Sequence, residues 1–405
     1  MAKQQERRLP EGWRSVKLGD VCVQDRQIIS AESDRANDLP YLSLEHIQSQ
    51  TGQIILDPKI HSEQSGKSST FFFDNRHILY GKLRPYLNKV ALPEFSGRCT
   101  TEAIPLLPLE DIDREFLAWT LRRDETVHIA MQGKTGSRMP RADMTDLFQM
   151  SIPLPRIAEQ KRLVAILNDR FAAIETARKA TEAQLEAAKA LPAAYLREVF
   201  NSPEAEGWRS VQLADVADFK NGINFTADQK GKGILTVDVL NMYSDNLFIK
   251  TNELYRINIE PKEDYLLQQN DILFVRSSVK REGVGWTSLC PFMPEPISFC
   301  GFIIRVRITI EQLLPEFLTH YCRASFVREQ LISKSGTGTI TNISQLQLKT
   351  LSVPLPPIAK QKEIVTTLND RFSTIETIRK AIEDQLEAIN ALPATLLRQA
   401  FNGEL

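Results

Sequence analysis

The chain has 405 residues, 42% of them hydrophobic, a formal net charge of −1 and five cysteines. This length suits two to three domains, and the hydrophobic fraction excludes an intrinsically disordered protein. The balanced charge excludes a strongly basic nucleic-acid binder, so any basic surface must be local. The cysteines form no CxxC pair and are expected to be reduced, and the absence of a long apolar run or signal-peptide pattern predicts a cytoplasmic protein.

Short apolar runs separated by polar turns predict a small, β-rich domain over residues 1–150. These runs are PYLSL, QIIL, TFFF and HILYG, and a helix is expected from about residue 112 to 131. Residues 206–351 show the same character, with the runs ILTVDVL, DILFV and SFCGFIIRVRI and a helix from about 311 to 333. We therefore expect two α+β domains, each with a curved sheet and a few helices.

Cations interleaved with tyrosines mark one stretch of the first domain, and an amide there is of the kind that reads adenine edges. The candidates for DNA binding in this stretch are Tyr80, Lys82, Arg84, Tyr86, Asn88, Lys89 and Arg98. A similar run in the second domain supplies Arg276, Ser277, Ser278, Lys280 and Arg281. Strands with solvated charges give the same pattern, so that alternative stays open.

Each domain also has a loop of small and basic residues before a proline-rich stop. Exposed Gly, Ser, Thr and Lys with available backbone N–H groups suit phosphate contacts. The candidate residues are Lys134, Ser137, Arg138 and Arg141 in the first loop, and Lys334, Thr337, Thr339 and Asn342 in the second. Flexible hinges have the same composition.

The segment 151–205 returns as 352–405, and this repeat organises the chain. Residues 151–201 and 352–402 align without a gap and are identical at 33 of 51 positions. The opening EGWRSV of each variable domain is repeated as well. A period near 200 residues is too long for a solenoid and indicates domain duplication.

Within each repeat the apolar residues recur at alternating steps of three and four, the seam of a coiled coil. The helices are expected to end at Leu191 and Leu392, before prolines, and to pair antiparallel as spacers between the two domains. The predicted seam residues are Val164, Leu167, Phe171, Ile174, Arg178 and Leu185, with Val365, Leu368, Phe372, Ile375, Arg379, Ile382, Leu386 and Ile389.

Polar residues on these helices have two further interpretations. The two seam arginines either set the register of the pair or extend to solvent. Residues on the outer faces are candidates for binding partner subunits, although solvated charges are normal on any coiled coil. These are Gln160, Lys161, Arg170 and Glu175, with Gln361, Lys362, Arg371 and Glu376.

Motifs for catalysis are missing from the sequence. There is no phosphate loop, nucleophile elbow, zinc-protease motif or Asn-Pro-Pro-aromatic motif, and the five histidines have no metal-ligand spacing. The chain is therefore expected to have no catalytic residues and no metal site.

The paired PLPxIAxQKxxVxxLNDRF helices, with ILYGKLRPYLNKV and GRCTTEAIPLLP, resemble the specificity subunit of type I restriction–modification systems. The resemblance implies a DNA-binding subunit whose two target-recognition domains each read half of a split, asymmetric sequence. It implies two adenine methyltransferase subunits and two restriction helicase–nuclease subunits as partners, which would bind S-adenosylmethionine, ATP and Mg. A related system with fused methylase and nuclease, or a coiled-coil protein adaptor, remains an alternative.

Overall fold

The computed structural model describes residues 9–30, 32, 38–55, 68–132, 138–244, 246–278, 283–333 and 341–405. The chain divides into two compact units, one formed by Met1–Ala180 with Leu386–Leu405 and the other by Thr181–Gln385. Each unit contains one variable domain and part of each long helix. The sequence-based domain limits at residues 150, 205 and 351 remain a prediction.

In the first unit the described strands form two four-stranded sheets and one strand pair. One sheet has the antiparallel order β2 (Cys22–Gln24), β9 (Ala103–Pro108), β6 (Ile78–Gly81), β7 (Val90–Ala91). The other has the order β3 (Ile28–Ile29), β5 (Thr70–Phe73), β8 (Gly97–Cys99), β4 (Tyr41–Leu42), with β4 parallel to β8. The pair joins β1 (Arg14–Lys17) to β10 (Ser151–Leu154), and the helices are α2 (Arg114–Leu121), α3 (Asp124–Met131) and α4 (Met144–Gln149).

In the second unit one sheet has the antiparallel order β12 (Ala217–Asn221), β19 (Ile303–Ile308), β15 (Ile272–Val275), β17 (Thr287–Leu289). Another has the order β14 (Tyr255–Ile257), β13 (Lys230–Val237), β18 (Ile297–Phe299). Two strand pairs join β11 (Ser210–Gln212) to β21 (Ser352–Pro354) and β16 (Ser277–Ser278) to β20 (Thr341–Asn342). The helices of this domain are α6 (Pro203–Glu206), α7 (Pro315–Arg323), α8 (Ser325–Ser333) and α9 (Gln345–Lys349).

The central sheets of the two variable domains have the same topology, although the sequences of the domains hardly resemble each other. The order β2-β9-β6-β7 in one corresponds to β12-β19-β15-β17 in the other, and all neighbours are antiparallel. In both units a pair of short helices and then a third follow this sheet in the chain. The predicted α+β class with two pseudo-symmetric domains is confirmed.

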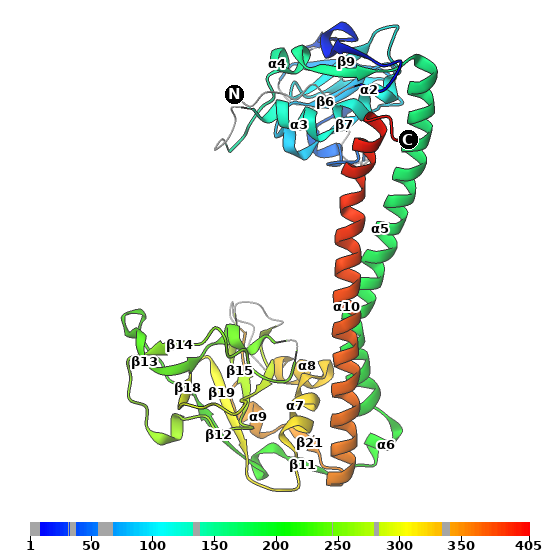
Figure 1. The fold of residues 1–405 in the computed structure, drawn as a ribbon. Helices are drawn as coiled ribbons and strands as arrows, with labels where there is room; N and C mark the ends of the chain where they lie inside the picture. Colours follow the sequence, from blue (N-terminus) through cyan, green and yellow to red (C-terminus); the bar gives the residue numbers. More distant parts are fainter. Residues whose placement is uncertain are drawn as a thin grey trace. The chain divides into compact units, whose positions relative to one another are not determined.

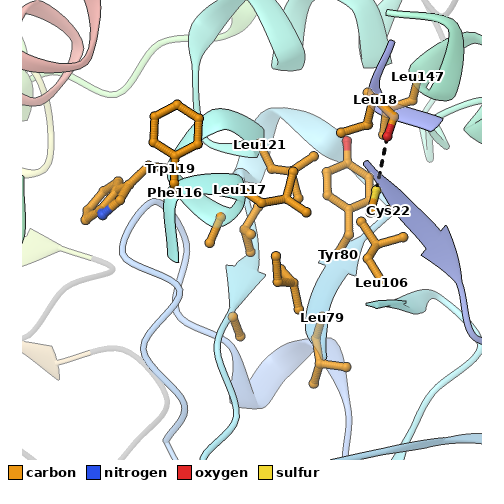
Figure 2. Packing of buried hydrophobic residues seen from close by; sticks show 14 of the residues in the cluster. Leu18, Cys22, Leu79, Tyr80, Leu106, Phe116, Leu117, Trp119, Leu121 and Leu147 are labelled. Atoms are coloured by element: carbon orange, nitrogen blue, oxygen red, sulfur yellow. Dashed lines mark hydrogen bonds between the residues drawn. The ribbon is translucent and has the colours of Figure 1, made fainter. Parts of the chain in front are cut away.

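The core of the first unit lies between this sheet and the helices that follow it, and α2 lies beside the sheet in Figure 1. Figure 2 shows the ring of Tyr80 from β6 among Leu18, Cys22 and Leu106, with Leu117 and Leu121 of α2 nearby. These side chains are almost fully buried. Burial of apolar surface of this kind is the dominant stabilising term in a domain of this size.

The single helices expected at about 112–131 and 311–333 are each broken in two. Arg123 and Ala324 have extended backbone angles, so that α2 ends before α3 and α7 before α8. The preceding arginines turn back to the sheet: Arg122 Nη2 donates to the carbonyl of Val90 at 2.7 Å, and Arg323 Nε donates to that of Thr287 at 2.8 Å. A continuous helix would carry these buried guanidinium groups away from their acceptors.

The prediction that the long helices end before their prolines is wrong. The helix α5 runs over Ile157–Phe200 and α10 over Ile358–Phe401, with Pro192 and Pro393 inside them. A proline inside a helix costs about 3 kcal/mol because it removes one backbone hydrogen bond and crowds the previous turn. The residues beyond each proline offset this cost by entering a domain core, where the ring of Phe200 lies 5.5 Å from Phe317 and that of Phe401 lies 5.2 Å from Phe116.

Contacts between the helices confirm their antiparallel pairing. In the second unit Arg371 of α10 is 3.2 Å from Glu198 of α5, while the earlier Lys360 is 3.2 Å from the later Glu204. In the first unit Arg162 of α5 donates to the terminal Leu405 carbonyl at 2.5 Å. The predicted seam residues of both helices are buried or half-buried.

The seam arginines Arg178 and Arg379 are half-buried and form ion pairs on their own helices. They bind Glu175 at 2.7 Å and Glu376 at 2.9 Å. Each therefore keeps its charge neutralised beside an apolar seam, which is compatible with either role expected from the sequence.

Two glutamines placed on the outer faces by the sequence are in fact completely buried, and this corrects their assignment to partner binding. Gln160 donates to the carbonyls of Pro155 and Asp111 at 2.9 and 3.1 Å and accepts from the Asp113 N–H at 2.8 Å. Gln361 donates to the carbonyls of Pro356 and Gln312, both at 2.8 Å, and accepts from the Leu314 N–H at 2.8 Å. Each amide thus ties the start of a long helix to the loop that precedes α2 or α7.

Replacing Gln160 or Gln361 with leucine should lower the free energy of unfolding of the corresponding unit by about 2–5 kcal/mol. The apolar side chain would leave one N–H and two carbonyl groups without the partners that they have in the wild-type protein. Differential scanning calorimetry measures this effect. The neighbouring exposed lysines provide the control, since Lys161→Ala and Lys362→Ala should shift stability by no more than about 0.5 kcal/mol. Equal losses of stability at the glutamines and the lysines would contradict the role of the glutamines in tying each long helix to its domain.

A second junction between helix and domain occurs in both units and uses different donors. Trp119 Nε1 donates to Asn168 Oδ1 at 3.1 Å, and its ring lies 4.3 Å from Phe171. At the matching place His320 Nε2 lies 2.9 Å from Asn369 Oδ1. Burial lowers the pKa of His320 to about 4, and the nearby Arg323 charge acts in the same direction against the hydrogen bond to Asn369.

The second unit should therefore lose stability as the pH falls from about 6.5 to about 4. In this window the unfolded chain binds a proton at His320 and the folded chain does not, so the loss reaches about 2–3 kcal/mol. His320 is the one histidine in residues 181–385. The variant His320→Gln keeps an N–H donor without the titration, so its unfolding free energy should depend less on pH across this window. Identical pH slopes for the two proteins would refute the role of His320.

Candidate nucleic-acid interface

In each unit, the segment after one strand of the central sheet pairs with the segment before a short helix. The strand and helix are β6 and α4 in the first unit, and β15 and α9 in the second. In the first unit the N–H of Lys82 donates to the Glu102 carbonyl at 2.9 Å, and the N–H of Ala142 donates to the Lys82 carbonyl at 2.8 Å. We call residues 82–84 and 140–142, together with Glu102, the first edge. The sequence placed candidates in both segments, and the structure brings them together.

The second unit repeats this arrangement of the backbone. The N–H of Arg276 donates to the Phe302 carbonyl at 2.8 Å, and the N–H of Ile343 donates to the Arg276 carbonyl at 2.9 Å. We call residues 276–278 and 341–343, together with Phe302, the second edge, which contains the β16–β20 pair. By these hydrogen bonds, Lys82 corresponds to Arg276 and Glu102 to Phe302.

The first edge carries several charged side chains. Arg141 Nε donates to Glu102 Oε1 at 2.9 Å and Oε2 at 3.2 Å, and Lys82 Nζ lies 4.0 Å from the same carboxylate. The hydrogen bond to Glu102 raises the pKa of the Arg141 guanidinium. Arg84 is exposed and has a left-handed backbone with a φ of 52°, a conformation that a non-glycine residue adopts at some energetic cost.

A hollow of about 460 Å³ lies beside the first edge. Its lining combines acids, bases and apolar groups and includes Arg84, Lys89, Glu45, Glu102 and Met139. Both cations and acceptors therefore face one depression, the mixture needed to read hydrogen-bonding groups as well as phosphate.

The second edge is less charged. Phe302 stands where the first unit has Glu102, and this phenylalanine is 59% exposed. Arg276 is half-buried and its Nη1 reaches the carbonyl of Gly301 at 3.5 Å. Asn342 is exposed, and Tyr243 donates to Ser278 Oγ at 3.4 Å. The same backbone thus presents a different chemical surface.

Three residues predicted to bind DNA are buried, and these assignments are corrected. Tyr80 lies in the core shown in Figure 2, where burial raises the pKa of its phenol above the usual range. Asn88 Nδ2 donates to the Arg122 carbonyl at 2.8 Å and so stabilises the break between α2 and α3. Arg98 is buried with its guanidinium 5.0 Å from the Tyr41 ring.

The other candidates of the first domain differ in exposure. Tyr86 and Arg138 are exposed, whereas Lys89 is half-buried and its Nζ donates to the Leu44 carbonyl at 2.6 Å. Burial lowers the pKa of Lys89, and the nearby Glu45 opposes this shift. Seven further candidates lie outside the described residues: Lys134, Ser137, Lys280, Arg281, Lys334, Thr337 and Thr339.

On the long helices Lys161, Arg170 and Lys362 are exposed and remain candidates for binding partners. Arg371 is engaged within the second unit instead, because its guanidinium lies 4.5 Å from the Tyr195 ring and pairs with Glu198. Glu175 and Glu376 bind the seam arginines described above.

The sequence pattern did not indicate Glu102 and Phe302, because cations, tyrosines, hydroxyl groups and amides are the groups expected to contact DNA. A single acid offers no separate signal in one sequence, and an isolated phenylalanine is typical of a core residue. Only the backbone pairing shows that these two residues occupy the same place on the two edges.

Among the described residues, no cluster of His, Cys, Asp and Glu could hold a metal ion. Across the same part of the chain, no helix has the length and apolar character needed to cross a membrane.

Comparison with known proteins places the chain in a family. The family model described as the type I restriction modification DNA specificity domain matches residues 10–187 and again 205–388. The chain is 25% identical to the StySPI specificity subunit of Salmonella potsdam and 23% identical to the EcoKI specificity subunit of Escherichia coli K12. Each of these alignments covers 98% of this chain and 90% of the relative.

Solved structures show the same fold. One from work on complex assembly and conformational transition of the type I R-M system gives a TM-score of 0.80 at 23% identity, covering 98% of this chain and all of the other. The HsdS subunit of Thermoanaerobacter tengcongensis gives 0.64 at 22% identity, covering 99% of each chain. With two copies of the domain over most of its length, the chain belongs to the family of type I restriction modification DNA specificity domains.

Proposed function

We propose that this chain is the specificity subunit of a type I restriction–modification system and that each edge reads one half of a split, asymmetric DNA target. The single observation that carries the proposal is the pair of edges, with matching backbone hydrogen bonds and different side chains. Matching backbones allow the same approach to DNA, and different side chains select different bases. Family membership supports target recognition without catalysis by this chain.

In this proposal the chemistry belongs to partner subunits. Two adenine methyltransferase subunits would use S-adenosylmethionine, and two restriction subunits would use ATP and Mg to cleave DNA. The repeated helices would act as the spacer, with exposed Lys161, Arg170 and Lys362 among the residues available to hold partners. The net charge of −1 suits this division, because partners would supply much of the phosphate contact.

A system in which methylase and nuclease are fused would use this chain in the same way. The mass and activity of the subunit that co-purifies with it distinguish the two systems. A protein adaptor without a DNA role fits less well, because it gives no reason for two edges with one backbone and different polar side chains.

Replacing residues 12–150 with the corresponding domain of another family member should change one half of the methylated sequence and leave the other half intact. Only the first edge is exchanged, so only its half-site should follow. Methylation mapping of host DNA measures both halves together.

The matched control exchanges residues 206–351 and should change the opposite half. Calorimetry of each chimera confirms that the long helices still pack on the new domain, since Phe401 and Phe200 reach into the two cores. Simultaneous change of both half-sites in either chimera would contradict independent reading.

A further inference from the structure

We infer that Arg141, positioned by Glu102, reads a guanine in the half-site recognised by the first unit. The inference rests on the proposed function and adds a base and two residues to it. Arg141 would be the specificity-determining residue, and Glu102 a positioning residue that acts through it.

The geometry of the ion pair leaves one side of the guanidinium available. Arg141 Nε lies 2.9 and 3.2 Å from the two Glu102 carboxylate oxygens, and Nη2 lies 2.9 Å from Oε1. The carboxylate therefore occupies the edge formed by Nε and Nη2. The opposite edge, formed by Nη1 and the second hydrogen of Nη2, makes no hydrogen bond to any described residue.

Guanine fits this remaining edge. In the major groove guanine presents two neighbouring acceptors, O6 and N7, and a guanidinium can donate two parallel hydrogen bonds to them. Adenine presents a donor beside its one acceptor, cytosine presents a donor, and thymine presents one acceptor beside a methyl group, so none of them can accept both bonds. The free edge of Arg141 thus selects guanine over the other bases.

The backbone holds both partners of the ion pair in place. Glu102 is pinned through its carbonyl to the N–H of Lys82, and Arg141 forms a β-bridge with Leu83. An exposed ion pair contributes little to stability, and the Arg141 side chain is 49% exposed. Its value lies in orientation, because a guanidinium already held by a carboxylate loses less conformational freedom when it meets a base.

The second edge lacks this arrangement. Asn342 stands at the place of Arg141, and Phe302 at the place of Glu102. The described residues of that edge therefore cannot form the same buttressed fork. Its half-site must be read by other contacts, so changes at Arg141 should affect one half-site alone.

The test uses the full-length chain in complex with the adenine methyltransferase subunit of its system. The probes are DNA duplexes in which each base pair of the wild-type target is replaced in turn, and kcat/KM for methylation is measured on every duplex. The variants are Arg141→Ala, Arg141→Lys and Glu102→Gln. The matched control is Arg14→Ala, which removes an arginine with a similar ion pair, 2.7 Å from Asp111, on the β1–β10 pair.

The wild-type complex should prefer G·C at one position of one half-site by about 5- to 150-fold. Arg141→Ala and Arg141→Lys should both abolish that preference and leave all other positions unchanged, because lysine keeps the charge without the planar fork. Glu102→Gln should weaken the same preference through KM rather than kcat. Arg14→Ala should change no preference.

Three results would overturn the inference. If the Arg141 variants lost the same factor in kcat/KM on every duplex, Arg141 would be a phosphate ligand. In that case the slope of log affinity against log salt concentration would also fall by about one. Unchanged preferences in all variants would exclude a role in reading. A preference altered by Glu102→Gln and unaffected at Arg141 would make the carboxylate the reader. Absence of sequence preference in the wild-type complex would instead contradict the proposed function.

Discussion

The structure depends on a few backbone hydrogen bonds at the end of one strand of each central sheet, β6 in the first unit and β15 in the second. These bonds hold the segment after that strand between two other segments of the chain. In the first unit these bonds place Lys82 between Glu102 and Ala142, and in the second they place Arg276 between Phe302 and Ile343. Backbone groups make these bonds whatever side chain is present. Side chains at the edge can therefore diverge without disturbing the fold, which is the condition for two readers built on one plan.

The long helices depend on a similar separation between framework and surface. Gln160 and Gln361 clamp the start of each helix by the same three hydrogen bonds. The residues after each internal proline enter a domain core at the other end. Burial and hydrogen bonding thus explain the identity of the two segments at Gln160 and Gln361 and along the seam. Exposed residues that are identical in the two helices, such as Lys161 and Lys362, are not explained in this way.

Much of this fold can be predicted from the sequence, because the repeat and its heptad spacing are periodic signals. The seam residues and the antiparallel pairing follow from them, and the α+β class follows from the short apolar runs of the variable domains. The errors have a common cause: besides the partner helix and solvent, a variable domain covers part of each long helix. Gln160 falls on the outer side of the heptad but lies under the domain, and Pro192 interrupts a helix that tertiary packing then sustains. The pairing of Leu83 with Arg141, and of Arg141 with Glu102, joins segments far apart in the chain and could not be predicted from the sequence.

The central claim is that two edges read two different half-sites. The most direct measurement selects DNA from a pool of randomised duplexes with the complex of this chain and its methyltransferase subunit, and sequences the bound molecules. The account predicts two blocks of specified bases, different from each other, separated by a constant number of unspecified base pairs. A single continuous block, or two blocks related as a palindrome, would contradict it.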